Sequence, residues 1–457
     1  MSKVARFSAR LKASALAVAL AVGGVGTAQA AELYFDFNAN FNPPTQASVF
    51  LFGDAGQTAT VSNLAGFNQT VTLNSDGFFN LFLPSAYQQS GTGIKNTGFK
   101  IVSPDPIAGY FVNRLNASTD MTYVFDSAAL GTNYVVASMG GGFGEGGQAM
   151  IHAMQNNTNV TFTPKGGAPV NVVLQAGETY KYASGTSVDL TGSVVSSDKP
   201  VAVFGGHQCA QVPPGTTFCD TLIEQMIPNN KLSKSYLLTA SKGAELAPAR
   251  SDLVRVIATV DGTEVKIDGV LVATLNKGDV HEFSLAEKTG AKVDASQPVM
   301  VAQYLKGGVG ANTDPAMSMV PGVDTWLDEY RLATPSGTQD FVVDYASLVI
   351  PTADLGSLLL NGVAVNTASF TGIAGTSFSR GIVDLPNGLF TLDASNDFLV
   401  MLGGGSSADS YFTFGGSTFA PGISPPDPTP VPEPAGLALL GLSLVGLAAI
   451  RRRRQRD

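Results

Sequence analysis

Residues 192–204 read Gly-Ser-Val-Val-Ser-Ser-Asp-Lys-Pro-Val-Ala-Val-Phe, with a glycine eight residues ahead of a proline that opens an apolar run. The same arrangement occurs at residues 98–110 and 290–302. A fourth apolar run, Phe398–Met401, follows without the proline, and the successive anchors lie 94, 98 and 99 residues apart. Proline suits the first position of a strand because it cannot donate to a sheet ladder. The chain is therefore predicted to repeat one unit of about 95 residues four times.

A second series of residues has the same period. Tyr134, Tyr236 and Tyr330 each precede two apolar or long side chains and lie 102 and 94 residues apart. Apolar and polar residues alternate in segments such as 160–163 and 265–267, which is typical of half-buried strands. A unit of this length holds six to eight short strands, the size of a β-sandwich domain.

The predicted fold class is all-β, with about four tandem antiparallel β-sandwich-like repeats over residues 31–420. Gly98, Gly192 and Gly290 are expected to close equivalent turns. Short helical turns are expected only in the connectors, around residues 221–226 and 324–330. The period does not decide whether the four units stand in a row or close into one body.

The N-terminal 30 residues have the features of a secretory signal peptide. Four basic residues precede an apolar stretch at residues 13–25, and Ala28-Gln29-Ala30 fits a cleavage site of small residues. The mature chain is therefore expected to begin at Ala31.

The C-terminal end has three parts in a fixed order. A proline-rich linker at residues 421–430 leads to Val431, Pro432, Glu433 and Pro434, then to an apolar run at residues 435–450. At 1.5 Å per residue a helix over this run is about 24 Å long, slightly shorter than the hydrocarbon core of a bilayer. Four arginines close the segment and keep its end in the cytoplasm: Arg451, Arg452, Arg453 and Arg454.

This tail at residues 431–457 resembles the PEP-CTERM sorting signal of Gram-negative bacteria. The resemblance implies a transmembrane helix that holds the chain transiently in the inner membrane. It also implies an exosortase as processing partner, which cuts near Val431–Pro434 and releases the protein to the outer surface or the extracellular matrix. An ordinary single-span tail anchor is the alternative.

The charge of the folded body narrows the choice of partners. The sequence has 27 basic and 36 acidic residues, and nine of the basic ones lie in the two terminal segments. With those segments removed, the body has a net charge of about −17. Such a charge argues against nucleic acid or an anionic membrane surface as partner.

Cys209 and Cys219 are the two cysteines of the chain. In an exported protein the default for such a pair is a disulfide, which would close a loop over residues 210–218. The alternative is a metal site that includes His207, but one histidine and two cysteines without a fourth ligand suit zinc poorly.

The centre of the chain resembles the N-terminal domain of IgGFc-binding proteins. The resemblance rests on residues 198–209, 212–214 and 219–226, and on shorter matches such as Val301-Ala-Gln-Tyr and Asp409-Ser-Tyr-Phe. It covers roughly residues 46–416 and implies a β-rich binding domain of secreted or surface proteins, with the two cysteines bridged.

No catalytic, cofactor or metal site is predicted. Gly142–Gly147 has the spacing of a dinucleotide loop, but no helix is expected after it. The three histidines offer no defensible catalytic arrangement, and Asp36-Phe-Asn38-Ala-Asn40 lacks the glycine and glutamate of a calcium loop and is expected to form a strand.

The predicted function is non-enzymatic binding or adhesion at the cell surface or in a biofilm matrix, with an exopolysaccharide or a protein as ligand. The alternative is an extracellular hydrolase that acts on polysaccharide.

Overall fold

The computed structural model describes residues 30–41, 47–115, 117–186, 188–335 and 340–419. Within these ranges the chain is almost entirely antiparallel β-sheet, with one short helix, α1 (Lys242–Leu246). The prediction of an all-β fold is confirmed. The predicted signal peptide up to residue 29, the proline-rich linker and the sorting segment lie outside the described residues.

The strands form four consecutive units with one topology. We label the eight strand positions of a unit A to H in chain order. One sheet of each unit has the order A-F-C-D, and the other has the order E-B-G-H. In units 2 and 4, positions F and G are the two halves of one continuous strand, β15 and β31.

The bounds of the strands show how evenly the units divide the chain. Unit 1 comprises β1 (Ala31–Phe35), β2 (Ser48–Phe52), β3 (Thr58–Asn63), β4 (Asn68–Thr72), β5 (Phe78–Phe82), β7 (Phe99–Ser103), β8 (Ala108–Leu115) and β9 (Ser118–Val124). Unit 2 comprises β10 (Gly131–Val135), β11 (Phe143–Ala153), β12 (Thr158–Thr163), β13 (Val170–Leu174), β14 (Thr179–Ala183), β15 (Val194–Ala210) and β16 (Asp220–Gln225). Unit 3 comprises β17 (Ser235–Thr239), β18 (Ser251–Ala258), β19 (Thr263–Ile267), β20 (Val270–Leu275), β21 (Val280–Ala286), β22 (Gly290–Ala295), β23 (Val299–Leu305) and β24 (Ala316–Met319). Unit 4 comprises β25 (Leu327–Ala333), β26 (Val343–Pro351), β27 (Leu359–Leu360), β28 (Val363–Ala364), β30 (Phe378–Asp384), β31 (Leu389–Ser406) and β32 (Asp409–Phe414).

Two short strands stand outside this scheme. β6 (Gly93–Lys95) leaves unit 1 and pairs with β14 of unit 2, which ties the two units together. β29 (Thr371–Gly372) pairs with β30 within unit 4.

The four apolar runs that define the period occupy one place in the fold. They lie in β8, the second half of β15, β23 and the second half of β31, always at position G between positions B and H. The repeated apolar pattern thus gives the same strand the same place in every unit. A shift of one residue in the pairing would turn the apolar face of the strand out of the core, so the pattern fixes the register.

The tyrosine series is also equivalent in space. Tyr134 donates its hydroxyl to the carbonyl of Val201 at 2.6 Å, and Tyr236 donates to the carbonyl of Val299 at 2.6 Å. Tyr330 makes the same bond to Phe398. Each tyrosine thus fastens strand A to the start of strand G in its own unit.

The expectation of equivalent glycine turns is wrong. Gly192 has a φ of +88°, in the left-handed region, whereas Gly98 and Gly290 are not left-handed. A Cβ at Gly98 would lie 2.7 Å from a carboxylate oxygen of Asp36, and one at Gly290 would lie 2.7 Å from the carbonyl of Leu238. Glycine is needed at those two sites for close packing rather than for a turn.

The expected helical turn at residues 221–226 is also wrong, because this segment forms β16. All six residues of β16 are buried, so both faces of the strand are covered and the apolar alternation of a strand is lost. Around residues 324–330, a 3₁₀ turn at Val323–Thr325 is followed by β25.

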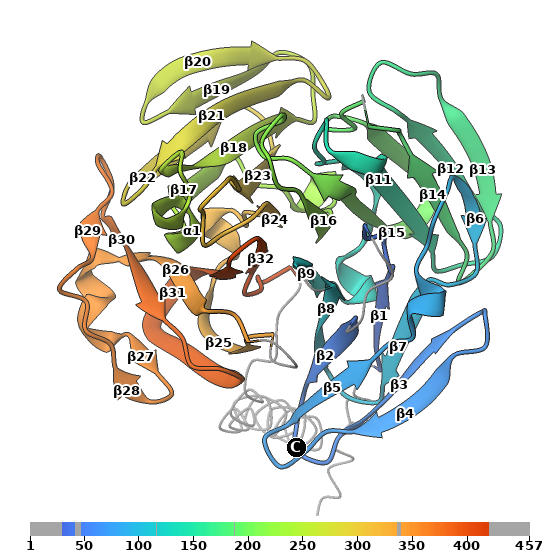
Figure 1. Ribbon diagram of the computed structural model, residues 1–457, viewed down its shortest axis with the longest axis horizontal. Helices are drawn as coiled ribbons and strands as arrows, with labels where there is room; N and C mark the ends of the chain where they lie inside the picture. The colour runs from blue at the N-terminus through green and yellow to red at the C-terminus, as the bar shows by residue number, and fades with distance from the viewer. Residues whose placement is uncertain (1–29, 42–46, 116, 187, 336–339, 420–457) are drawn as a thin grey trace, which may run out of the picture.

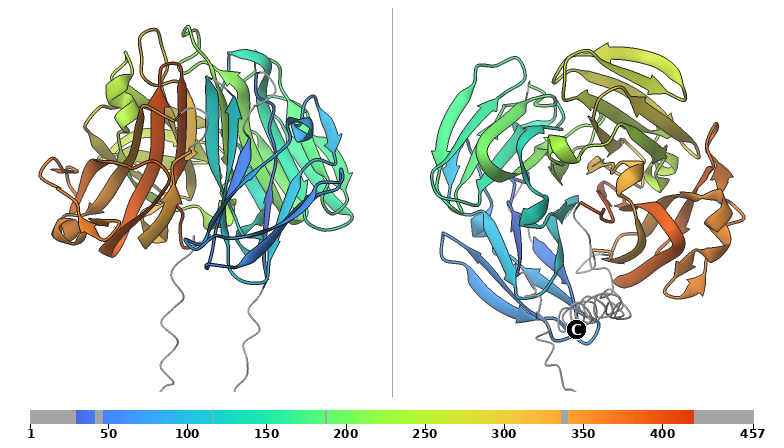
Figure 2. Two further views of the ribbon diagram at one scale, coloured as in Figure 1. Left: turned by 60° about the horizontal axis from the view of Figure 1, so that its bottom comes forward. Right: turned by 180° about the vertical axis from the view of Figure 1, so that it is seen from behind.

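The four units close into one ring. β9, β16, β24 and β32, the position H strands, lie together at the centre, and each contacts the H strands of both neighbouring units (Figure 1). Figure 2 shows the strands running between the two faces of the ring. The four-unit body is therefore closed and has an approximate four-fold axis.

Candidate functional site

The antiparallel topology sorts the connecting loops onto two faces. Because strand G pairs antiparallel with both B and H, strand B begins where G ends and H begins, so the A–B and G–H connections lie at one end of a unit. The A–B and G–H connections surround the axis at that end, and we call them the loop face. Their described residues are 36–41, 47, 136–142, 240–250, 334–335 and 340–342 for A–B, and 117, 211–219, 306–315 and 407–408 for G–H.

The opposite end of the ring, which we call the terminal face, holds both ends of the body. β1 begins there at Ala31, and β32 ends there at Phe414. The B–C, D–E and F–G connections and the linkers between units lie at the same face. Helix α1, in an A–B connection, stands at the loop face (Figure 2).

Asp120 lies at the centre of the ring. Its carboxylate oxygens accept four backbone N–H groups, from Met121 at 3.0 Å, Ile223 at 3.0 Å, Met317 at 3.3 Å and Phe412 at 3.2 Å. These four donors come from β9, β16, β24 and β32, one from each unit. One side chain therefore serves all four units at the axis.

Further carboxyl groups lie on either side of Asp120 along the axis. Asp220, Asp314 and Asp409 are buried at the loop-face ends of the H strands of units 2, 3 and 4, where unit 1 has Ser118. Towards the terminal face, Glu224 is buried and accepts the hydroxyl of Thr122 at 2.9 Å. The ring thus closes around five buried acidic side chains from four units.

Burial shifts the protonation of these groups. Burial, together with the charge of Asp409, raises the pKa of Asp314 to about 8, and burial raises the pKa of Asp409 to about 7. The pKa values of Asp220 and Glu224 are also raised, chiefly by burial and then by neighbouring carboxylates. Burial raises the pKa of Asp120 too, although its four N–H bonds oppose this shift.

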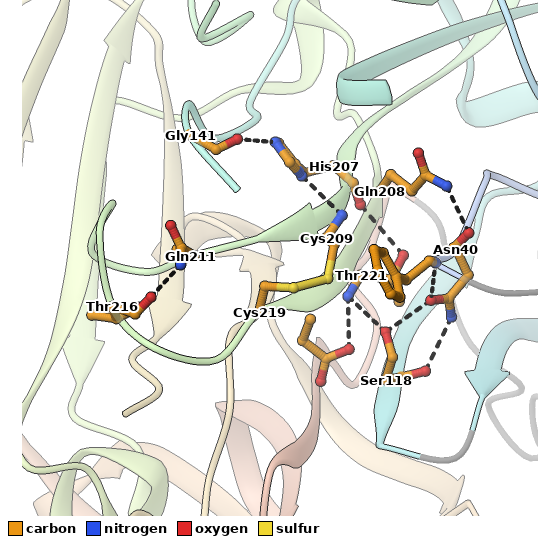
Figure 3. Close-up of a disulfide and its surroundings, with 12 residues drawn as sticks. Asn40, Ser118, Gly141, His207, Gln208, Cys209, Gln211, Thr216, Cys219 and Thr221 are labelled. Atoms are coloured by element: carbon orange, nitrogen blue, oxygen red, sulfur yellow. Dashed lines mark hydrogen bonds between the residues drawn. A yellow bond between two sulfur atoms is a disulfide. The ribbon is translucent and has the colours of Figure 1, made fainter. Parts of the chain in front are cut away.

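The structure joins Cys209 and Cys219 in a disulfide, with their Cα atoms 5.1 Å apart (Figure 3). The bridge closes the G–H connection of unit 2 on the loop face, as the sequence predicts. His207 lies beside it and is buried. Its Nδ1 accepts the backbone N–H of Cys209 at 3.0 Å, and its Nε2 donates to the carbonyl of Gly141 at 2.8 Å.

The surroundings of His207 leave its ring no free nitrogen for a metal ion at the cysteines. Both ring nitrogens are engaged, and burial lowers the pKa of His207 to about 4, so the ring is neutral. Across the described ranges, no group of three or more His, Cys, Asp or Glu side chains is arranged to hold a metal ion.

A cavity of about 400 Å³ opens on the loop face between units 1 and 4. Arg114 and Ala117 line it from unit 1; Asp340, Val342, Ser406, Ser407 and Asp409 line it from unit 4. The guanidinium of Arg114 lies over the ring of Phe341 at 5.0 Å. Two acidic side chains line this cavity near the axis, Asp340 and the largely buried Asp409.

The remaining motifs of the sequence have structural positions. Gly142–Gly147 leads into β11 rather than a helix, and His152 and His281 lie in β11 and β21. Asp36, Asn38 and Asn40 are buried beyond the end of β1, so the expected strand is wrong there; they bond to units 1 and 2, as in the 3.1 Å bond from Asn38 to Thr221.

The sorting motif at residues 431–434 and the arginines at residues 451–454 lie outside the described residues. In the part of the chain that the structure describes, no helix is long and apolar enough to cross a membrane.

These features define a class of protein, a closed β-scaffold with loops gathered on one face and both chain ends on the other. The chain belongs to the IgGFc binding protein family, whose sequence pattern matches residues 120–404. A PEP-CTERM protein-sorting motif matches residues 430–454, which implies export through a membrane-anchored intermediate and processing by an exosortase.

The human IgGFc-binding protein is 26% identical over 324 residues. The match covers 66% of this chain but only 6% of the human protein, so the chain spans a small part of that relative.

Comparison with solved structures gives low scores. An α-L-rhamnosidase of Streptomyces avermitilis is 10% identical with a TM-score of 0.15, covering 66% of this chain and 39% of the enzyme. A Ca²⁺-stabilised ice-binding adhesin of an Antarctic bacterium is 13% identical with a TM-score of 0.12, covering 83% of this chain and 95% of the adhesin. Scores this low establish no common fold.

Proposed function

We propose that this protein is a non-enzymatic binding protein of the outer surface or extracellular matrix, and that its loop face meets the ligand. The observation that carries the proposal is the separation of the two faces. The chain continues from the terminal face towards the sorting motif, so the loop face points away from the membrane while the anchor is present and lies opposite the processed C-terminus after the exosortase has cut. Ligand-binding loops on a rigid β scaffold are a common arrangement. The ligand class is an exopolysaccharide or another matrix protein.

Retention on native extracellular material tests this proposal. The mature chain, residues 31–430, is given a single new cysteine at Val309 on the loop face or at Gln297 in an F–G connection on the terminal face. Both positions are exposed, Val309 to 67%. A bulky polymer coupled at Val309→Cys is expected to abolish retention, whereas the same polymer at Gln297→Cys leaves it intact. The reverse pattern would place binding on the wrong face and overturn the proposal.

Processing makes a separate prediction about localisation. Secreted protein is expected to begin at Ala31 and to end close to Val431–Pro434, as measured by mass spectrometry. Replacing Pro432, Glu433 and Pro434 by alanine should leave the protein in the inner membrane, since the apolar segment remains while the recognition motif is lost. Secreted protein that still contains the arginines at residues 451–454 would contradict the assignment.

The cavity between units 1 and 4 favours a second candidate, a hydrolase that acts on polysaccharide. Asp340 and Asp409 both line it, burial raises the pKa of Asp409, and glycosidases use a pair of carboxyl groups of which one has a raised pKa. A reducing-sugar assay on the mature protein decides between the candidates. Turnover that Asp409→Asn abolishes would establish the hydrolase, and the binding proposal expects no turnover.

A further inference from the structure

We infer that Phe41, Phe143 and Phe218 form an aromatic platform that binds a neutral polysaccharide. This inference rests on the proposed function and names the ligand class. The three side chains are 52%, 49% and 39% exposed. Among the described phenylalanines, the fourth with a largely exposed side chain is Phe82, at 56% on β5. Phe41 and Phe218 lie in loop-face connections of units 1 and 2, and Phe143 is the first residue of β11, at the same end of unit 2.

The contacts of Gln208 and Cys209 bring the three segments together. Phe143 lies opposite Cys209 in the pairing of β11 with β15. Phe218 precedes Cys219, which the disulfide ties to Cys209. The carbonyl of Asn40, next to Phe41, accepts the side-chain amide of Gln208 at 2.8 Å (Figure 3).

The backbone beneath the rings is firmly held. Asn40 is buried and donates to the carbonyl of Ser118 at 3.0 Å. Gly142 has a φ of +71°, and a Cβ there would lie 2.0 Å from the carbonyl oxygen of Cys209. The backbone on both sides of Phe143 therefore packs too closely against β15 to shift freely. A preorganised surface of this kind loses little conformational entropy on binding.

The platform has no charge, although the protein as a whole is strongly acidic. Residues 37–41, 138–144 and 210–218 contain no ionisable side chain. Glu145, two residues after Phe143, is paired with Lys181 at 2.8 Å, and Asp189, which packs against Gly140, is paired with Arg255 at 2.8 Å. Asp220, two residues after Phe218, is buried with a raised pKa, and His207 is neutral. Besides the rings, the platform offers the side chain of Thr217, which is exposed, and the amide of Gln211, which also bonds to Thr216 and Gly215 within the loop.

This chemistry matches a neutral sugar chain. Aromatic faces suit the C–H faces of sugar rings, and amides and hydroxyls suit sugar hydroxyls. An anionic polymer would find no accessible cation on the platform, since Lys181 is buried and paired. A protein partner is less well matched, because the platform lacks the tryptophan, tyrosine and arginine side chains that anchor protein interfaces.

Affinity electrophoresis of the mature chain tests the inference. The probes are amylose, dextran and a soluble β-glucan as neutral chains, and alginate as an anionic one. At least one neutral probe is expected to retard the protein. The double substitution Phe143→Ala and Phe218→Ala should weaken that binding about tenfold or more. Phe82→Ala, which removes an equally exposed ring from β5, should leave it unchanged.

Three outcomes would overturn the inference: retardation by alginate alone, neutral-chain binding that the double substitution leaves unchanged, or no retardation by any neutral probe. The native extracellular material separates these outcomes from the proposed function. If that material retains the protein while the neutral probes do not bind, the ligand class is wrong and the proposed function stands. If nothing retains the protein, both fail.

Discussion

Replacing Asp120 by alanine is expected to lower the free energy of unfolding by about 4 kcal/mol or more. The substitution leaves four buried N–H groups without an acceptor, one in each unit, and each unsatisfied buried donor costs about 1–3 kcal/mol. Chemical denaturation of the mature chain, followed by tryptophan fluorescence and circular dichroism, measures the loss.

Two further variants show whether the effect belongs to the axis. Asp120→Asn keeps one accepting oxygen and should cost less than alanine. Asp105→Asn, which removes a charge from an exposed connection of unit 1, should change stability by less than about 0.5 kcal/mol. An alanine variant at residue 120 that is as stable as the asparagine variant at residue 105 would show that the four N–H bonds do not hold the ring closed.

The protein is also expected to become less stable as the pH rises from 5 to 8. Asp314 and Asp409 have pKa values of about 8 and about 7 in the folded protein, against 3.8 for an ordinary aspartate. Between these limits the folded state binds more protons than the unfolded state, so the free energy of unfolding falls as the pH rises. Each pKa unit corresponds to about 1.4 kcal/mol per group, so a loss of about 3 kcal/mol or more is expected over this range.

The neighbouring charges define the control for this pH dependence. Besides burial, the charge of Asp409 raises the pKa of Asp314, and the charges of both raise the pKa of Asp220. The Thr119 hydroxyl and Arg114 favour ionisation of Asp409. Asp314→Asn removes one of the ionisations. It should match the wild type at pH 5, exceed it in stability at pH 8 and flatten the profile between them. Thermal unfolding at a series of pH values measures this, and stability that rises with pH would contradict the protonation of the axial groups.

The period of the sequence predicted the units because each one is a complete β-sandwich with its own pattern. Position G and the tyrosine of position A repeat at nearly the same interval, since both are fixed by packing within a unit. Closure of the ring could not be predicted, because it depends on contacts between units. The misassigned β16 shows the reason: its second face is buried against other units, which removes the alternation that identifies a strand.

Three of the axial carboxyl groups could have been recognised from their spacing in the sequence. Asp220, Asp314 and Asp409 follow one another at intervals of 94 and 95 residues, the period of the units. Asp120 left no such signal, since an aspartate between Thr119 and Met121 in a strand segment is typical of a solvent-exposed strand face. The disulfide was predictable, because the chain has two cysteines and the predicted signal peptide implies an oxidising compartment. The position of Phe41 near the disulfide was not predictable, because well over 100 residues separate Phe41 from Cys209 in the sequence.

Hydroxyl-radical footprinting of the protein bound to native extracellular material tests the role of the loop face most directly. Aromatic side chains are labelled when exposed, and Phe143, Phe218 and Phe82 are all exposed in the free protein. Loss of labelling at Phe143 and Phe218 with unchanged labelling at Phe82 is the predicted result. Unchanged labelling at Phe143 and Phe218, with protection of the linkers at residues 226–234 on the terminal face, would contradict the account.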